Sequence, residues 1–191
     1  MKILENKFIS IILMLVLIAG GLFIGGMKGL NGLYSDVEDV FFLGIDRDGI
    51  GVANDMSERV KAAFNMVTVA RKYEDTANET YKEAVDSLRA DAADLELAVA
   101  YGKGDIADAV ATNKLVESSM TFLYNEMVHV NLSEQDEKYR QKLYADFNSR
   151  GDTISHDPYN QYAEEYMQTL KGFPASLIAA VMPVKEAAVA F

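Results

Sequence analysis

Residues Phe8 to Met27 form a run of 20 residues without a charged side chain, bracketed by Lys7 and Lys28. As an α-helix, a run of this length extends over about 30 Å, which matches the hydrocarbon core of a bilayer. The run therefore predicts a single membrane-spanning helix near the N-terminus. The rest of the chain is then expected to fold in water.

A cleaved signal peptide is the rival interpretation of this run. Lys2 and Lys7 resemble a basic n-region, and Ala19-Gly20-Gly21 supplies small residues near a possible cleavage point. However, apolar residues continue through Leu22 to Ile24, beyond the point where the apolar part of a signal should end. We therefore favour a retained anchor over residues 8–27.

The charges that flank the run predict its orientation. Lys2 and Lys7 precede it, whereas Lys28 is followed by Asp36 and Glu38. By the positive-inside rule, the N-terminus is expected in the cytoplasm and the domain outside it, although Lys28 weakens the bias.

The soluble part of the chain is strongly acidic. Residues 1–33 hold three lysines and one acid, so 15 basic and 28 acidic residues remain, a net charge of −13. Such a domain repels phosphate backbones and anionic headgroups, which argues against a nucleic-acid partner and for a domain that stands off the bilayer. The chain has no Cys, which excludes disulfides, thiolate nucleophiles and Cys-ligated zinc.

The apolar pattern after residue 51 is helical. No Gly or Pro occurs from Val52 to Tyr101, and Asp75, Asn78 and Thr80 are the expected point of a break. Asp105 and Ser133 stand where helix caps are expected, and residues 151–158 are expected to interrupt the last helical stretch. The expected buried stripes, at three- and four-residue steps, are Val52, Met56, Val60, Ala63, Val67 and Ala70, then Ile106, Val110, Asn113, Met120, Tyr124 and Met127, then Tyr139, Leu143 and Phe147.

No stretch alternates with period two for long enough to predict a strand. Amphipathic helices joined by short turns bury their apolar faces best as an antiparallel bundle. We therefore predict an all-α protein with a transmembrane anchor and juxtamembrane segment over residues 1–33 and an antiparallel four-helix bundle within residues 34–191.

The C-terminal helix carries a pattern of aromatic and aliphatic residues, Tyr159-Asn160, Tyr166, Leu170, Phe173-Pro174 and Leu177-Ile178-Ala179. This pattern resembles that of the LemA family of membrane-anchored bacterial proteins, with Met167 in place of the family's second Asn. A weaker similarity lies at Arg59, Asn65 and Val67, with Phe64 where the family usually has Pro. The resemblance implies a four-helix bundle, an envelope or membrane-organising role and no known catalytic residues.

The same residues have a physical interpretation without the family. Tyr159, Tyr166, Leu170 and Phe173 share one helix face, so they are expected to pack as an aromatic and aliphatic seam with the phenol groups at its edge. Pro174 is expected to end the helix and to turn the apolar tail back toward the bundle.

Two short motifs suggest metal ligands, and neither is complete. Glu126 and His129 have the Glu-x-x-His spacing of di-iron bundles, but the second such motif is missing. Asp46 and Asp48 resemble part of a calcium loop that lacks its remaining acidic ligands, so a tight turn is the simpler interpretation. Hence we predict no catalytic, cofactor or metal site.

The function expected from these observations is that of a non-enzymatic envelope scaffold or protein-interaction factor. An extracytoplasmic ligand-sensing domain that works through a partner is the alternative. Self-association through the membrane is also expected, because Gly21, Gly25 and Gly29 are spaced by four residues and leave a groove for a second helix.

Overall fold

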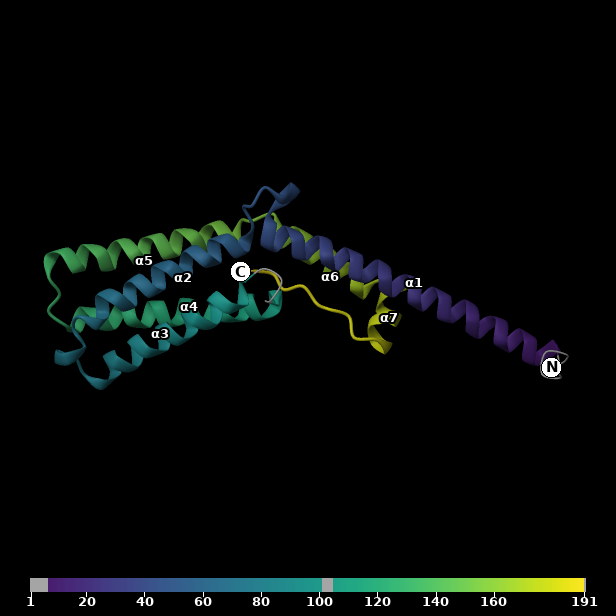
Figure 1. Ribbon diagram of the computed structural model, residues 1–191, viewed down its shortest axis with the longest axis horizontal. Coiled ribbons are helices and arrows are strands. Elements are labelled where there is room, and N and C mark those ends of the chain that lie inside the picture. Colours follow the sequence, from purple (N-terminus) through teal and green to yellow (C-terminus); the bar gives the residue numbers. More distant parts are fainter. Residues whose placement is uncertain (1–6, 101–104, 191) are drawn as a thin grey trace.

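The structure is a computed structural model that describes residues 7–100 and 105–190. Figure 1 shows an elongated molecule in which a four-helix bundle and a long N-terminal helix lie end to end. Within the described ranges the chain forms helices and no β-strand, so the predicted all-α class is confirmed. The α-helices are α1 (Lys7–Leu43), α2 (Val52–Arg71), α3 (Glu79–Ala98), α4 (Ile106–Glu126), α5 (Glu134–Ser155), α6 (Tyr159–Lys171) and α7 (Ala175–Val181), with 3₁₀ turns η1 (Ile45–Arg47), η2 (Glu74–Thr76) and η3 (Met127–His129).

Helix α1 extends without a break over 37 residues and is apolar and long enough to cross a membrane. Its first half stands free of the rest of the protein, with exposed side chains from Ile11 to Leu22. Burial begins at Leu30 and continues through Tyr34, Val37 and Phe41, because α6 and α7 pack along that half of the helix. The boundary expected at residue 33 therefore falls inside a continuous helix.

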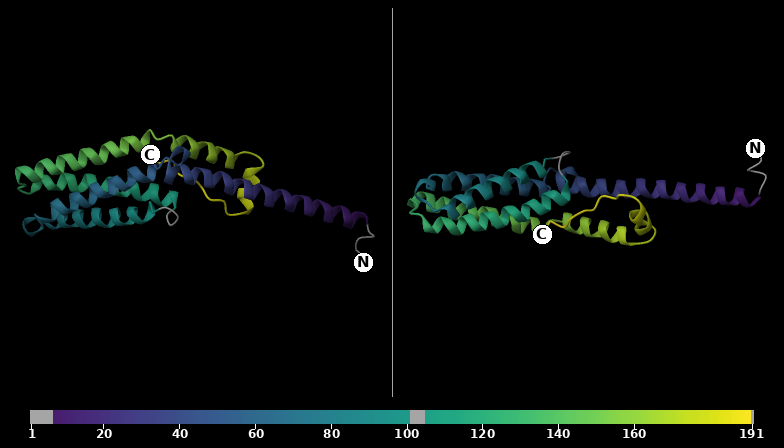
Figure 2. Two further views of the ribbon diagram at one scale, coloured as in Figure 1. Left: turned by 45° about the horizontal axis from the view of Figure 1, so that its top comes forward. Right: turned by 90° about the horizontal axis from the view of Figure 1, so that it is seen from below.

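Helices α2 to α5 form the bundle, and each packs antiparallel to its neighbours (Figure 2). All six expected stripe residues of α2 are buried, as are Ile106, Val110, Asn113 and Met120 on α4 and Met127 at the start of η3. Burying these side chains removes apolar surface from water, which is the main force that holds the helices together. The predicted four-helix bundle is confirmed.

The helix caps follow from side-chain chemistry. Asn78 accepts a hydrogen bond from the Tyr81 N–H and opens α3 after the break that η2 makes. Asp105 caps α4 through the Ala107 N–H, and Ser133 caps α5 through the Asp136 N–H. These caps satisfy backbone donors that a helix leaves unpaired at its start. The turn expected at residues 102–104 lies outside the described residues.

Helix α5 corrects two predictions. It continues through Gly151 to Ser155, so the interruption is confined to residues 156–158. Its buried stripe is Asp136, Arg140, Phe147 and Ile154, whereas Tyr139 is exposed. The prediction failed because two polar side chains, rather than apolar ones, occupy the buried face at the start of the helix.

The C-terminal segment leaves the bundle and packs on α1 (Figure 1). Helix α6 lies beside the second half of α1, α7 crosses near its middle, and residues 183–190 return toward the bundle. We refer to residues 159–190 as the C-terminal strap. The strap and the second half of α1 bury a common apolar core that is continuous with that of the bundle.

Candidate functional site

A buried arginine lies in the core of the bundle. Arg59 of α2 is only 2% exposed, and its guanidinium group reaches α4 and α5. Nη1 donates a hydrogen bond of 2.6 Å to Asn113 Oδ1, and Nη2 donates one of 3.1 Å to Glu117 Oε2. The guanidinium carbon lies 3.9 Å from the centroid of the Phe147 ring, a cation–π contact.

The backbone of α5 makes room for this side chain. A Cβ atom at Gly151 would lie 3.5 Å from Arg59 Cζ, an ordinary contact distance, so α5 packs directly against the guanidinium group at this position. Burial lowers the pKa of Arg59, and the Glu117 carboxylate opposes that shift. Because the ordinary pKa of arginine is far above neutral, the group remains a buried cation.

An open pocket of about 350 Å³ adjoins the arginine, lined in part by Asn113, Glu117 and Gly151 and by Ala190 of the strap. The Nε–H of Arg59 is buried and has no hydrogen-bond partner within the described residues. A guanidinium edge with a free donor suits a carboxylate, which accepts two parallel hydrogen bonds. The side chain of Glu117, which pairs with Nη2, is 60% exposed and lines the same pocket.

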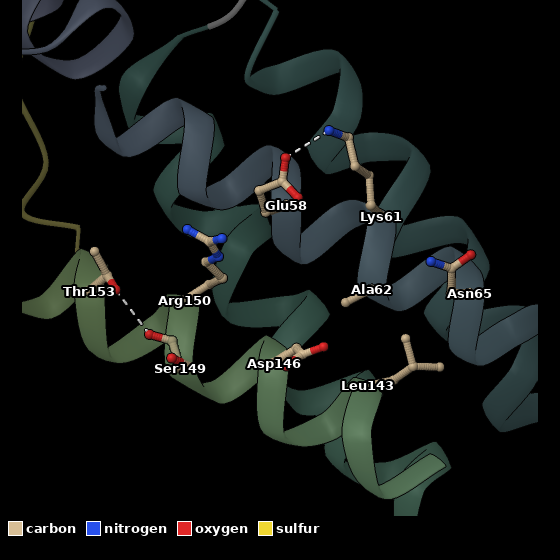
Figure 3. Close-up of a pocket in the computed structure, with 9 residues that line it drawn as sticks. All are labelled: Glu58, Lys61, Ala62, Asn65, Leu143, Asp146, Ser149, Arg150 and Thr153. Carbon is tan, nitrogen blue, oxygen red and sulfur yellow. Dashed lines mark hydrogen bonds and ion pairs between the residues drawn. The ribbon is translucent and has the colours of Figure 1, made fainter. Parts of the chain in front are cut away.

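A second hollow lies on the outer face between α2 and α5, with a volume of about 370 Å³ (Figure 3). Glu58 and Lys61 of α2 pair with each other on one side, while Asp146 and Arg150 of α5 line the other. Arg150 is also held by Asp55, to which it donates a hydrogen bond of 2.8 Å. Charges of both signs already pair around this hollow, so it presents a solvated polar groove.

The distal end of the bundle is tied by one carboxylate. Asp136 of α5 accepts hydrogen bonds from Lys72 Nζ and from the Tyr73 hydroxyl, both of 2.7 Å, and from the Ser133 hydroxyl. These donors hold the pKa of Asp136 below its usual value, with Lys72 the largest cause. The group joins the end of α2 to the start of α5 and so fixes two bundle helices relative to each other.

Most of the strap residues singled out in the sequence lie together against α1 and the tail. Tyr159, Asn160, Tyr166 and Leu170 are buried. The Tyr159 hydroxyl donates a hydrogen bond of 2.7 Å to the Ala188 carbonyl, and the Tyr166 hydroxyl donates one of 2.7 Å to the Lys185 carbonyl. Burial raises the pKa of both phenols, so they remain hydrogen-bond donors at neutral pH.

Asn160 and the aromatic rings complete the attachment. Asn160 Oδ1 accepts a hydrogen bond of 2.9 Å from the Ala190 N–H, and its amide nitrogen donates to the Ile154 carbonyl. The Tyr159 ring packs edge-on against Phe41 of α1, with centroids 5.0 Å apart. The seam therefore fastens the returning tail and α1 rather than closing the bundle itself.

Phe173 is the exception, because its side chain is 84% exposed. The expectation that it lies in the seam is wrong: α6 ends at Lys171, and the chain turns before Phe173 can follow the face of Tyr166 and Leu170. Pro174 stands directly before α7 and is exposed as well.

The anchor glycines lie on a free face of α1. A Cβ atom at Gly21, Gly25 or Gly29 would meet no atom within 4 Å, so neither the bundle nor the strap covers them. Gly26 differs, because a Cβ there would lie within 2.3 Å of Ile178 Cδ1 of α7. The glycine stripe remains open to a second helix, while the adjacent glycine admits α7.

The suspected metal motifs gain no further ligands in the structure. Glu126 ends α4 and His129 lies in η3, so the two do not share a continuous α-helix. Asp48 Oδ1 accepts a hydrogen bond from the Ile50 N–H in a turn that also holds Asp46 at φ 56°. Among the residues that the structure describes, no three His, Asp or Glu side chains are grouped to hold a metal ion.

Comparison with known proteins gives no relative: no family model, no curated protein and no solved structure matches this chain. The resemblance to the LemA family therefore stays a prediction that rests on the residues quoted above.

The sequence held a signal for the arginine site that the predictions did not combine. Asn113 and Glu117 stand four residues apart on the face of α4 where apolar residues are expected. Two polar residues at core positions indicate a buried polar partner. Arg59 is a cation beside the buried stripe of α2, because it directly precedes Val60 of that stripe. The groove of Figure 3 had no comparable signal, because its charges are ordinary for exposed helix faces.

Proposed function

We propose that this chain is a non-enzymatic, membrane-anchored helical-bundle protein that serves as an envelope scaffold or protein-interaction factor, similar in role to LemA proteins. In this proposal α1 is retained as a single transmembrane helix, with the N-terminus in the cytoplasm and the bundle outside it.

The observation that carries the proposal is the continuity of α1. One helix contains both the exposed apolar half and the half that is buried under the strap. We refer to the bundle, the strap and the second half of α1 together as the head. A retained anchor explains why the first half of α1, with apolar side chains such as Leu15 and Leu17, stands exposed beside this compact head. Since the helix does not break at the membrane exit, the anchor holds the head at a fixed distance and angle.

The geometry gives the head a defined reach. Residues 28–43 of α1 cover about 24 Å of helix, and bundle helices of about 20 residues add a further 30 Å or so. The two parts lie end to end (Figure 1). The η2 turn and the start of α5 are therefore expected about 50 Å from the bilayer surface. A protein that holds an acidic helical surface at a fixed height is suited to contact another envelope protein.

The absence of Cys allows a direct test of anchor and orientation. Ser87 lies exposed on α3, so a Ser87→Cys variant of the full chain can be labelled with a maleimide that does not cross membranes. We expect labelling in intact spheroplasts and retention of the protein in the membrane fraction after a salt wash. Labelling only after lysis would reverse the orientation, and release by salt would refute the anchor.

Photocrosslinking tests the interaction role. A photoreactive residue at Ser87 in growing cells should give a discrete adduct with one protein, whereas the same residue at the fully buried neighbour Leu88 should not. The same scan is repeated at Lys142 on the exposed face of α5. The interaction role is refuted if exposed positions on the four bundle helices give the same crosslinked products as their buried neighbours, or none.

A ligand-sensing domain is the second candidate function, and the unpartnered Nε–H of Arg59 beside a pocket of about 350 Å³ favours it. The chemistry there suits a small carboxylate. A sensor should gain thermal stability from such a ligand, since a ligand that binds only the folded state shifts the unfolding equilibrium. Arg59→Met should abolish this gain in thermal stability. An interaction protein should show no gain, either in the unmodified chain or in the Arg59→Met variant.

A further inference from the structure

The strap exposes an apolar face at one end of the head. Phe173, Leu177 and Val181 are spaced by four residues and are 84%, 53% and 72% exposed. They lie in an uncharged segment of 13 residues, 172–184, which is flanked by Lys171 and Lys185. An uncharged segment bounded by lysines, in a domain that is otherwise acidic, repeats on a smaller scale the pattern of the anchor itself.

The position of this face along α1 is fixed by a close contact. The Ile178 side chain, which is buried between the exposed positions 177 and 181 of α7, fills the space where Gly26 lacks a Cβ. Gly26 is the penultimate residue of the uncharged run that ends at Met27. Phe23, one turn earlier, is also partly buried against the apolar core. Thus α7 packs at the level where α1 leaves the hydrocarbon.

We propose that α7 and the turn before it lie in the interfacial layer of the bilayer that α1 crosses, with Phe173, Leu177 and Val181 in contact with lipid. An apolar helix face that lies along a membrane gains by burying its side chains at the boundary between headgroups and acyl chains. Lys28 and Lys171 are exposed and directly adjoin the uncharged segments of α1 and of the strap. Their amines are therefore placed to reach the headgroups while their stems remain in the apolar layer.

A second copy of the chain is the other occupant that an apolar face could have, but the structure favours lipid. Helix α7 contacts α1 at Gly26, two residues from Ile24, which belongs to the exposed apolar surface of α1. A bilayer around α1 therefore reaches α7 without any rearrangement of the head. The consequence is a second point of attachment, which fixes the rotation of the head about the axis of α1.

This inference rests on the proposed function, because it requires α1 to be retained in the bilayer. The test uses single-cysteine variants of the full chain, each labelled with the fluorophore NBD and reconstituted into vesicles of phosphatidylcholine and phosphatidylglycerol. Lipids that carry a nitroxide quencher near the headgroup or deep in the acyl chain report contact and depth.

Leu177→Cys is the test position, and Leu115→Cys on α4 is its matched control, because the two leucines are similarly exposed. Leu17→Cys, in the middle of the anchor, reports insertion of α1. We expect quenching at position 177 to be several-fold stronger than at position 115 and stronger with the shallow quencher, whereas position 17 responds most to the deep one.

The outcomes separate the two proposals. Quenching at position 17 with none above control at position 177 overturns the lipid contact and leaves the anchor intact. No quenching at position 17 overturns both. Disulfide-linked dimers of the Leu177→Cys variant, without quenching by lipid, would assign the face to a second copy and also overturn the proposal.

Discussion

The neutral amide of Asn113 should stabilise the bundle more than the charged carboxylate of Glu117, although both accept a hydrogen bond from Arg59. Asn113 is 4% exposed, so water cannot replace its oxygen as the partner of Nη1. The Glu117 side chain is 60% exposed, so its ion pair is largely screened by solvent. Burial, rather than formal charge, therefore decides which partner matters.

The magnitudes follow from this difference. Asn113→Leu keeps the number and branching of the side-chain heavy atoms but leaves a buried, charged donor without its acceptor, which costs about 2 to 3 kcal/mol of unfolding free energy. Glu117→Gln keeps a hydrogen-bond acceptor at an exposed site and should cost less than about 1 kcal/mol. Arg59→Met in the Asn113→Leu background removes the buried charge altogether and should recover much of the loss.

The assay is urea unfolding of the full chain in detergent micelles, followed by the far-ultraviolet circular dichroism of the bundle. The midpoint should shift with an unchanged slope if only stability differs. A double-mutant cycle over Arg59 and Asn113 should give a coupling energy above about 0.5 kcal/mol. A larger loss in Glu117→Gln than in Asn113→Leu, or additive effects in the cycle, would refute the assignment of Asn113 as the main partner.

Four further predictions follow from the strap, the distal end and the helix contacts. Tyr166→Ala should lower the free energy of unfolding by about 3 to 5 kcal/mol in the same assay, because the ring is buried. Phe173→Ala should change it by less than about 0.5 kcal/mol, because the ring is exposed. Equal losses would show that both rings lie in the core. The pKa of Asp136 is lower in the folded protein than in the unfolded chain, so the stabilisation that this carboxylate gives is fully present above the unfolded pKa of about 3.9 and is lost as the pH falls through the folded value. Below about pH 5, the urea midpoint should therefore fall less steeply with pH in Asp136→Asn than in the unmodified chain. The same pH dependence in both proteins would contradict this prediction. Gly151→Ala should be neutral or stabilise by up to about 1 kcal/mol, since the added methyl meets Arg59 at an ordinary contact distance and alanine is the better helix former; a loss of more than about 1 kcal/mol would show that the helix cannot accept a Cβ there. Gly25→Ile should abolish crosslinked dimers in membranes while insertion persists, because the glycine face of α1 is open to a second helix; an unchanged dimer fraction would assign self-association to the head.

The fold could be predicted because its signals are local. The stripe from Val52 to Ala70 repeats at helical spacing for five turns, and burial of that stripe is what a bundle requires. Asn78, Asp105 and Ser133 cap helices because their short side chains reach backbone N–H groups within three residues. Neither feature depends on which distant segment packs against it.

The parts that failed depend on contacts between distant segments. Gly151 was taken as a helix breaker, yet α5 continues through it and packs there against Arg59, 92 positions earlier in the chain. The exposure of Phe173 depends on where α6 stops, and the strap is held by hydrogen bonds to a tail that has no periodic pattern. Sequence spacing places side chains on one face of one helix and carries no information on which partner that face meets.

In the proposed anchored arrangement, the second half of α1 separates the acidic bundle from the membrane. Residues 52–157 contain 20 acidic and 12 basic residues, and a bundle of this charge is repelled by anionic headgroups at short range. Residues 28–43 of α1 raise the bundle by about 24 Å, which is more than two Debye lengths at physiological ionic strength, so the repulsion is largely screened.

In the same proposed arrangement α7, by contrast, lies at the level of the bilayer surface, and residues 171–185 around it carry two lysines and no acid. The positively charged segment around α7 thus lies next to the lipid, whereas the negatively charged bundle is held away from it. In the proposed interaction role, the acidic surface of the bundle then meets a basic surface of a partner tens of ångströms from the bilayer, where lipid does not shield it.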